Sequence, residues 1–566
     1  MTLLLLTLLG CNRDDPVAPV EEVEVVVLPI LEVVGPVRGS FWPSGSRVLV
    51  QGTVTAGTHP LSALTINGQP ATWDEEGWFS AEINATPGIN LLGVRLEDHG
   101  GERAVDGRSF HYAGDHEHGA TVEDAVWMRL GPTLLDDDEA TPDDLAAIAE
   151  RLVEDPSIAD SFLGTRIEED DYELEIRDID WSGVEVDLTP RDEVLWADVL
   201  LQDVRLDFDV FGVGWYDWIS TSGYVTAHTV LIQTDLSPNG TAVEVTSVDA
   251  VIEGFELEIE WVPFDDLLAE SARTSLEDNL RSIISETAGE LVSDYLEAFA
   301  VTVEPFEGVE LSLALAGLEV TSTGLELTMD GTVQALGNVE LPVDAGSLTA
   351  PGDRDWDPTE AFAVALDDDL VNALLFAMWA GGGLGFEFDG DALGALTGAP
   401  LPPPMGPVQQ AAMSLGLPPV LVPAATEEHD LTLSLGELTI DLLREDGERL
   451  TASINTAAGG WLEQSGTELV ITLDDRPRNV AVEVGMLQSP EALDPGDLAS
   501  LFRLTTPTLL GSAGSFLPSI PLPGVPLDLF AEHPDLNGKE LYVKDAAVTF
   551  QQSGWLTVAG DVEVVE

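Results

Sequence analysis

Three of the eight histidines lie in one short acidic segment, which makes it the first candidate for metal chemistry. His111, His116 and His118 are interleaved with carboxylates between residues 111 and 118. Imidazole and carboxylate groups at this spacing are ligands for divalent metal ions. A closed metal site also needs groups that orient the ligating histidines, and the sequence identifies none here. We therefore expect a polar linker between domains at this position, with no metal ion or other cofactor.

The sequence lacks the common catalytic motifs. It contains no Gly-x-Ser-x-Gly nucleophile elbow, no His-Glu-x-x-His pair and no phosphate-binding glycine loop. The glycine-rich run 381–386 lacks the last glycine of a dinucleotide fingerprint, and it follows a helical pattern instead of a strand. Among 103 acidic residues, carboxylate pairs suited to glycoside hydrolysis arise by chance. We predict no catalytic residues and a protein that is not an enzyme, with a glycan-active enzyme as the least favoured alternative.

The only cysteine, Cys11, follows a short apolar run that ends at residues 8–10. A run of this length does not span a bilayer, which takes about 20 apolar residues. The run and the cysteine resemble the lipobox of bacterial lipoproteins, and the resemblance implies cleavage before Cys11 and acylation of its thiol. It also implies a membrane-attached protein of the bacterial cell envelope, at the outer membrane or cell surface. The alternative is a stray apolar N-terminus with an inert thiol. A single cysteine excludes an intramolecular disulfide.

The chain is strongly acidic, with a formal net charge of −81 over 566 residues. Such a surface repels nucleic acid and anionic lipid headgroups, so we exclude nucleic acid as a partner. Runs of charge are usually solvated faces, and adaptation to a saline habitat explains them better than specific cation binding. The length and the 44% apolar content allow three or four domains with large cores. The sequence does not indicate any protein partner.

The spacing of apolar residues and the positions of turn motifs divide the chain into four parts. Residues 1–21 are the signal and its tether, and residues 22–113 read as a small β-sandwich with a hairpin at Asn67-Gly68. The sandwich resembles the immunoglobulin-like domains of bacterial secreted proteins, which implies a spacer or a binding module. Residues 114–305 and 306–566 form two successive units, each with a long antiparallel sheet and amphipathic helices.

Helices are expected at four places in these two units. The first runs from Pro142 to Val153 with Thr141 as its N-cap, and the second covers residues 264–298 directly after the alternating strand 255–261. The third, from Asp368 to Ala380, ends at three glycines, and the fourth lies around 498–510. The expected fold class is therefore α+β: an N-terminal β-sandwich followed by two elongated barrels, each a curved antiparallel sheet wrapped around amphipathic helices.

The order of these elements resembles the tubular lipid-binding superfamily, the two-barrel proteins related to bactericidal/permeability-increasing protein and lipopolysaccharide-binding protein. The segments that carry the resemblance are 126–130, 172–176, 255–298, 362–372 and 520–523. The resemblance implies an apolar groove for acyl chains in each barrel and binding or transfer of lipid without chemistry. The predicted groove residues are Phe255, Leu257, Ile259, Leu276, Leu280, Ile283, Ile284, Leu291, Leu370, Leu374 and Met378.

The hairpin tip at 211–219 departs from this family. It carries four aromatic residues and an acid where the antibacterial members carry basic side chains. Capture of lipopolysaccharide phosphates by cationic side chains is therefore not expected. The aromatic side chains either enter a membrane interface or pack against a neighbouring loop, and the second is the commoner outcome.

The leading hypothesis is a lipid-anchored envelope protein that binds or transfers lipid or another amphiphile in its barrel grooves. The main alternative is a surface adhesion or scaffold protein whose barrels are filled by their own side chains. Amphipathic helices against a one-sided apolar sheet fit both, because the pattern does not distinguish an open groove from a closed core.

Overall fold

The computed structural model describes most of the chain. The described residues are 26–42, 45–112, 121–137, 144–154, 156–168, 172–213, 220–259, 302–336, 352, 354, 360–390, 407–426, 428–466, 468–474, 476–490, 494–513, 520–521, 525–526 and 539–565. The acylation candidate Cys11, the linker residues 113–120, the tip residues 214–219 and the predicted helix 264–298 lie outside them.

Two facing sheets form the N-terminal sandwich and enclose two apolar clusters. Their strands are β1 (Ile30–Gly35), β2 (Ser40–Trp42), β3 (Arg47–Thr55), β4 (Leu61–Ile66), β5 (Gln69–Ala71), β6 (Trp78–Asn84), β7 (Gly88–Asp98) and β8 (Arg103–Tyr112). One sheet has the order β1-β3-β6 and the other β2-β8-β7-β4-β5. The predicted turn joins β4 to β5: Asn67 and Gly68 both have positive φ, 49° and 75°, as a two-residue hairpin turn requires.

The longest strands belong to a seven-stranded sheet, here called the end sheet. Its strands are β10 (Arg166–Glu168), β11 (Tyr172–Asp180), β12 (Gly183–Arg191), β13 (Val194–Gly212), β14 (Ser220–Asn239), β15 (Ala242–Glu253) and β16 (Glu256–Ile259). Strands β13 and β14 are 19 and 20 residues long and pair antiparallel along nearly their whole length. Buried residues alternate along both strands with half-buried or exposed ones, so the sheet has one apolar face and one polar face.

An eight-stranded sheet, the central sheet, joins strands that are far apart in the sequence. Its order is β17 (Thr302–Phe306), β18 (Val309–Thr321), β19 (Gly324–Ala335), β9 (Thr121–Leu130), β20 (Phe362–Asp367), β31 (Trp555–Val565), β30 (Glu540–Phe550) and β29 (Val525–Pro526). Strand β9 lies between β19 and β20 and pairs with both. Strands from both sides of the expected boundary at 305/306 therefore share one sheet.

The remaining strands form the C-terminal sheet. They are β21 (Phe386–Asp389), β22 (Val408–Leu415), β23 (Val420–Pro423), β24 (Leu431–Arg444), β25 (Arg449–Ser465), β26 (Glu468–Leu473), β27 (Val480–Gln488) and β28 (Ile520–Pro521), with a short 3₁₀ turn at Pro477–Asn479. The main path is β21-β22-β24-β25-β26-β28, while β23 pairs with β24 and β27 pairs with β25.

Four of the five helices of the described residues have 13 residues or fewer, and α7 has 19. They are α1 (Pro132–Leu135), α2 (Leu145–Val153), α3 (Pro156–Ser161), α5 (Asp368–Ala380) and α7 (Pro495–Ala513). The bounds predicted for α5 are confirmed. Helix α2 begins three residues later than predicted, because its N-cap is Asp144, whose side chain accepts a hydrogen bond from the Ala147 amide. In the part of the chain that is described, no helix has the length and apolar character to cross a bilayer.

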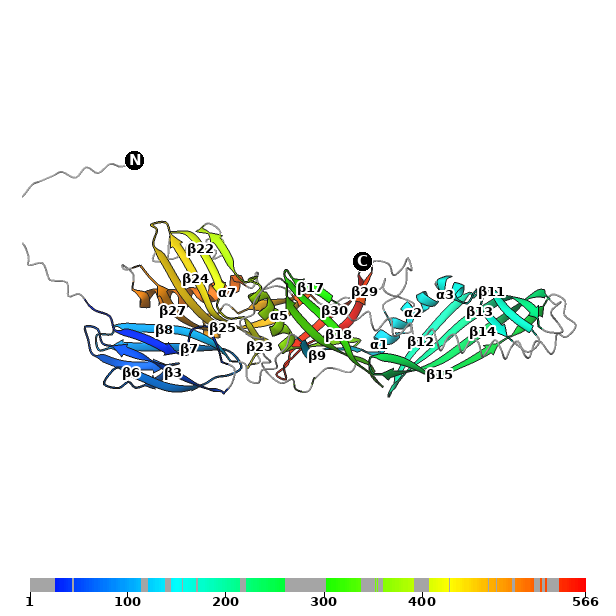
Figure 1. Ribbon diagram of the computed structural model, residues 1–566, viewed down its shortest axis with the longest axis horizontal. Helices are drawn as coiled ribbons and strands as arrows, with labels where there is room; N and C mark the ends of the chain where they lie inside the picture. The colour runs from blue at the N-terminus through cyan, green and yellow to red at the C-terminus, as the bar shows by residue number, and fades with distance from the viewer. Residues whose placement is uncertain are drawn as a thin grey trace, which may run out of the picture.

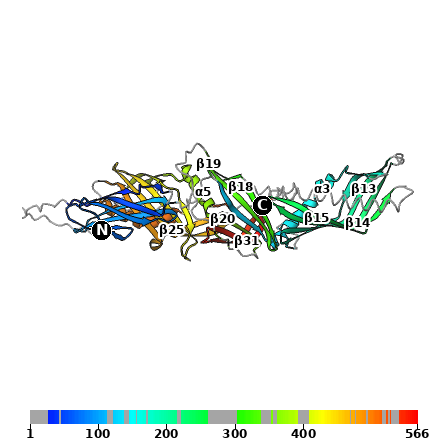
Figure 2. The same cartoon turned by 60° about the horizontal axis from the view of Figure 1, so that its bottom comes forward.

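The three large sheets follow one another along an elongated molecule (Figure 1). The sandwich and the C-terminal sheet lie side by side at one end, the central sheet and α5 lie in the middle, and the end sheet lies at the far end, as the rotated view also shows (Figure 2).

The predicted fold class, two barrels each wrapped around amphipathic helices in an α+β protein, is wrong. The described chain is mostly β, in several curled sheets. Its helices lie against individual sheets, and sheet-to-sheet packing supplies much of the burial that the prediction assigned to helices. Alternation with period two shows that a strand has an apolar face, but not whether a helix or another sheet covers it.

Candidate functional site

The apolar face of the end sheet is built from two neighbouring clusters of buried side chains. The first cluster includes Leu206, Phe208 and Val225, and the second includes Val186 and Val230. Alternate residues of β13 and β14 supply most of both clusters, so the face follows directly from the sequence pattern.

Glycine makes room for the largest of these side chains. Phe208 is paired with Gly223 across β13 and β14. A Cβ atom at Gly223 would lie 2.9 Å from Phe208 Cζ, so the ring packs directly over the glycine backbone.

Three predicted groove residues, in the edge strand β16 and directly before it, lie on this apolar face. Phe255, Leu257 and Ile259 are half-buried and pack against the first cluster, and Phe255 also reaches the second. Strand pairing sets Leu257 opposite Val225 and Ile259 opposite Gly223. The predicted partners on the long helix lie outside the described residues: Leu276, Leu280, Ile283, Ile284 and Leu291.

The opposite face of the same sheet is acidic and carries ion pairs. Arg166 Nη2 lies 2.8 Å from Glu175 Oε2, and Arg177 Nη1 lies 3.2 Å from Asp209 Oδ1. These arginines are more than half exposed, and such surface pairs contribute at most about 1 kcal/mol each. The sheet is thus apolar on one side and solvated on the other.

The other predicted groove residues, Leu370, Leu374 and Met378, lie on α5 in the core of the central sheet. They are 2%, 7% and 7% exposed and belong to the largest apolar cluster. A Cβ atom at Gly331 of β19 would lie 2.6 Å from Leu370 Cδ1, which shows how closely the helix packs on the sheet. Asn372 fixes α5 to β23, because its side chain both accepts from the Leu421 amide and donates to the Leu421 carbonyl, at 2.8 Å each.

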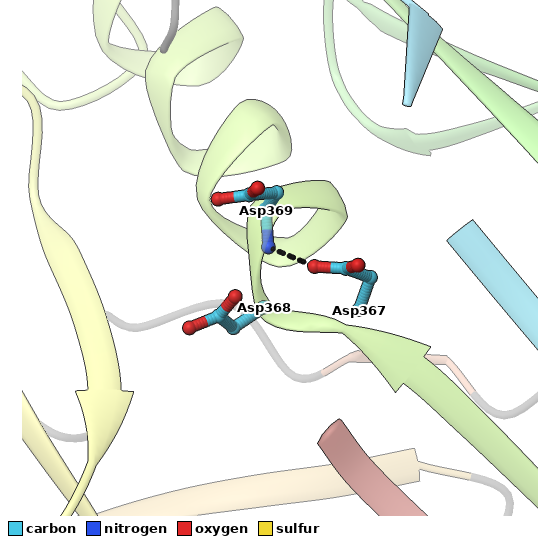
Figure 3. A group of neighbouring side chains, drawn as sticks. All are labelled: Asp367, Asp368 and Asp369. Atoms are coloured by element: carbon cyan, nitrogen blue, oxygen red, sulfur yellow. Dashed lines mark hydrogen bonds between the residues drawn. The ribbon is translucent and has the colours of Figure 1, made fainter. Parts of the chain in front are cut away.

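Three consecutive aspartates lie where β20 passes into α5 (Figure 3). Asp367, Asp368 and Asp369 each offer a carboxylate oxygen, and these atoms lie within 4.8 Å of one another. Asp367 is the N-cap of the helix: its Oδ1 accepts from the Asp369 amide at 2.8 Å. Burial raises the pKa of Asp367 to about 6, while the hydrogen bond from the Asp369 amide acts in the opposite direction by stabilising the carboxylate. The cluster therefore has the chemistry of a helix cap.

A polar network that the sequence did not reveal joins the sandwich to the C-terminal sheet. Glu437 of β24 is 6% exposed and accepts from the Ser109 amide at 2.7 Å, from Ser453 Oγ at 2.5 Å and from Arg38 Nη1 at 3.2 Å. Arg38 also bonds Asp106 of β8. Ser109 and Arg38 lie more than 300 positions from Glu437 in the sequence, and no local pattern marks these contacts.

Close backbone contact and a second ion pair complete this junction. A Cβ atom at Gly107 would lie 2.5 Å from the Val484 nitrogen, so β8 and β27 touch through their main chains. Glu483 pairs with Arg95 of the sandwich at 2.8 Å and with Arg503 of α7 at 3.2 Å. The sandwich is therefore docked on the C-terminal sheet.

The histidine segment begins in regular structure. His111 lies in β8, is 6% exposed, and its ring lies 5.2 Å from the ring of Phe41. His116 and His118 lie outside the described residues, so the linker prediction stays a prediction.

Comparisons with known proteins give only distant likenesses. No protein-family model matches the sequence, and the search of curated proteins gives no match. Among solved structures, the chain is similar to lipopolysaccharide binding protein, with a TM-score of 0.38, 16% identity, and coverage of 79% of this chain and all of that one. It is also similar to P47 of Clostridium botulinum E1, with a TM-score of 0.27, 8% identity, and coverage of 78% and 100%.

A third solved structure matches a smaller part. The fibronectin(III)-like modules of Clostridium thermocellum CbhA align over 41% of this chain and 94% of their own, with a TM-score of 0.14 and 9% identity. At these TM-scores and identities, the three likenesses do not define a function for this chain.

Proposed function

We propose that this protein binds lipid or another amphiphile on the apolar face of the end sheet, and that it is held at the bacterial cell envelope through acylated Cys11. The observation that carries the binding proposal is the extent of that face. Two apolar clusters adjoin along β13 and β14, and the edge strand β16 extends them with side chains that are only half-buried. Half-buried apolar side chains beside a buried cluster gain free energy, about 25 cal/mol per Å², when an acyl chain covers them.

The second candidate is a scaffold protein with closed cores and no ligand. It is favoured by α5, where Leu370, Leu374 and Met378 are packed against the central sheet at contact distance. The proposal therefore assigns ligand binding to the end sheet and not to α5. Neither candidate involves catalysis.

Two matched substitutions separate these candidates. Leu257→Trp adds bulk on the half-buried strand β16, and Leu374→Trp adds the same bulk in the packed core of α5. Overpacking a closed core costs about 1 to 3 kcal/mol of unfolding free energy, whereas bulk placed in a ligand site displaces the ligand.

The measurements are bound amphiphile, by native mass spectrometry after incubation with phospholipid vesicles, and unfolding free energy, by denaturant titration. We expect wild type and Leu374→Trp to carry lipid, and Leu257→Trp to lose it with little loss of stability. If wild type carries no lipid and both variants lose stability equally, the scaffold candidate is correct.

A further inference from the structure

The sheet of the sandwich that consists of β1, β3 and β6, here called the outer sheet, has a core side and an exposed side. On the core side, Val33, Val50 and Phe79 are buried in the apolar interior of the sandwich. Successive residues of a strand point to opposite sides, so the residues that alternate with these lie on the exposed side. Four residues of the exposed side are large and apolar, with exposed fractions of 39% to 60%: Ile30, Val34, Leu49 and Trp78.

Exposed apolar side chains are concentrated at this place. The described residues include thirteen large apolar side chains that are exposed, and four of them share this one side of one sheet. Two more, Val26 and Val27, lie shortly before β1 in the chain. Single exposed apolar residues are normal on a protein surface, whereas several on one face indicate an interaction site.

Strand pairing intersperses these side chains with polar ones. Glu32 of β1, Thr53 of β3 and Trp78 of β6 form one row across the sheet. Leu49 lies opposite Glu82 in another row. Neighbouring strands are about 4.8 Å apart, so Trp78 and Leu49 each have a hydroxyl or carboxyl group within one strand spacing. Such a mixture suits the headgroup layer of a bilayer, where apolar atoms reach the acyl boundary while polar groups stay in water, and where Trp is enriched.

The exposed side of the outer sheet is turned away from the neighbouring domain. Strands β7 and β8 of the second sheet of the sandwich pack on β24, β25 and β27 of the C-terminal sheet. Strands β3 and β6 lie on the side of the sandwich away from that contact (Figure 1). A flat partner can therefore reach the outer sheet without displacing another sheet of the described chain.

The position of Cys11 in the chain favours a lipid surface as this partner. Fifteen residues lead from Cys11 to Val26, and β1 begins four residues later. A chain of fifteen residues spans at most about 55 Å, since each residue adds no more than about 3.6 Å. With the acyl chain of Cys11 in a bilayer, contact between the outer sheet and lipid is an intramolecular event, with an effective concentration on the order of millimolar. A protein partner or a second copy of the chain has no such advantage.

The charges on the exposed side select the kind of lipid. They are Glu32, Glu82 and Arg47, which sum to −1. Binding to anionic lipid needs a cluster of Lys and Arg side chains, and this side has a single one. The rest of the chain, with its formal net charge of −81, adds repulsion from anionic headgroups. The outer sheet therefore fits a bilayer whose headgroups carry no net charge.

We propose that the outer sheet is a membrane-docking surface for the same neutral bilayer that holds the acyl chain of Cys11. The acyl chain keeps the sandwich close to the membrane, and the outer sheet fixes which side of the sandwich faces the lipid. This inference rests on the proposed acylation of Cys11 and is independent of amphiphile binding by the end sheet. The side chains that enter the headgroup layer are Ile30, Val34, Leu49 and Trp78.

The single cysteine of the chain makes a direct test possible. Acylation blocks the thiol of Cys11, so Leu49→Cys introduces the one thiol that reacts with a maleimide of the fluorophore NBD. Ala63→Cys is the matched control, because Ala63 is exposed in β4 on the second sheet of the same sandwich and shares the same tether. Each labelled full-length chain is reconstituted into vesicles of phosphatidylcholine and phosphatidylethanolamine. Quenching of NBD by doxyl-labelled lipid measures contact with the bilayer, and quenching by iodide measures contact with water.

The label at position 49 should be quenched by doxyl lipid and shielded from iodide, and the label at position 63 should show the reverse. Trp78→Thr in the Leu49→Cys chain removes the largest apolar side chain and keeps a residue that favours strands, so the docking constant should fall at least about tenfold. Val34→Thr should lower it about fourfold. The same substitution at Val251, a similarly exposed residue of β15 in the end sheet, should leave it unchanged.

Three results overturn the proposal. The first is equal quenching by iodide at positions 49 and 63, which places the outer sheet in water. The second is a label at position 49 that is shielded from iodide but not quenched by doxyl lipid, with shielding that increases with protein density, because a second copy of the chain then covers the sheet. The third is a docking constant that Trp78→Thr leaves unchanged.

Two further measurements separate docking from the proposed function. If the wild-type chain takes up the maleimide, the thiol of Cys11 is free and the acyl anchor is wrong. The Cys11→Ser chain with Leu49→Cys, mixed with an excess of the same vesicles, then decides docking by itself: doxyl quenching at position 49 supports it, and its absence overturns it. Bound amphiphile in native mass spectra should be the same in wild type and Trp78→Thr, and a wild type without amphiphile removes the function of the end sheet but leaves docking.

Discussion

The junction between the sandwich and the C-terminal sheet gives the sharpest test of the structure. The perturbation is Glu437→Gln, which keeps the shape of the side chain and one acceptor oxygen but removes its charge. Glu437 is buried and accepts three hydrogen bonds, from Ser109, Ser453 and Arg38. A hydrogen bond to a charged group contributes about 1.5 to 3 kcal/mol, against about 1 kcal/mol for a neutral one.

The expected cost follows from what the amide retains. Gln keeps an acceptor oxygen for the Ser109 amide, but its amide nitrogen replaces Oε2 and does not accept from Arg38 or Ser453. Arg38 keeps its bond to Asp106. The loss is therefore the charged bond to Arg38 and the charge assistance at Ser109, at least about 2 kcal/mol. Glu437→Ala also leaves a buried amide unpaired and should cost about 3 to 5 kcal/mol.

The assay is hydrogen exchange at the Ser109 amide, whose acceptor lies across the junction. A loss of 2 kcal/mol in docking corresponds to roughly a thirtyfold loss of protection. Glu445→Gln is the matched control, because Glu445 is an exposed residue beyond the end of the same strand. If Glu437→Gln changes protection at Ser109 and the unfolding free energy no more than Glu445→Gln does, the ionic junction does not hold the sandwich in place.

Three other predictions concern charge, anchoring and packing. The pKa of Asp367 is raised from 3.8 to about 6, so stability should fall by about 2 kcal/mol as the pH rises from 4 to 6. Asp367→Asn should remove that slope in denaturant titrations at each pH. Because self-repulsion of the −81 charge is screened by salt, the unfolding midpoint should rise equally with any salt at matched ionic strength, and a response to micromolar calcium alone would contradict this. Cys11→Ser should move the protein from the membrane to the soluble fraction, and unchanged retention would exclude an acyl anchor.

Several local features of the structure could be predicted from the sequence. The bounds of α5 were correct because a strand pattern, two aspartates in the first turn and three closing glycines mark both of its ends. Strand β16 was found from strict alternation between residues 255 and 261. The start of α2 was wrong by three residues, because Thr141 and Asp144 are both good N-cap residues and burial of Asp144 decides between them.

The candidate site was predictable only in part. Alternation indicated that Phe255, Leu257 and Ile259 share one face, and the structure shows what that face packs against. It did not indicate that Leu370 of α5 would meet the backbone of Gly331 in a packed core. No sequence pattern marked Glu150 and Asp136 as the acceptors for the Val186 and Leu188 amides of β12, since any of the 103 acidic residues is an equal candidate.

The sequence by itself determined the bounds of α5 and the alternation of the long strands, because periods of 2 and 3.6 residues are properties of the local chain. It determined the acidic surface in the same way, from composition alone. Only the tertiary structure decided that β9 lies between β19 and β20, and that the sandwich docks on the C-terminal sheet. The physical reason is that apolar burial has no direction: the pattern shows which face of an element must be covered, while the choice of cover depends on shape and on hydrogen-bond partners hundreds of residues away.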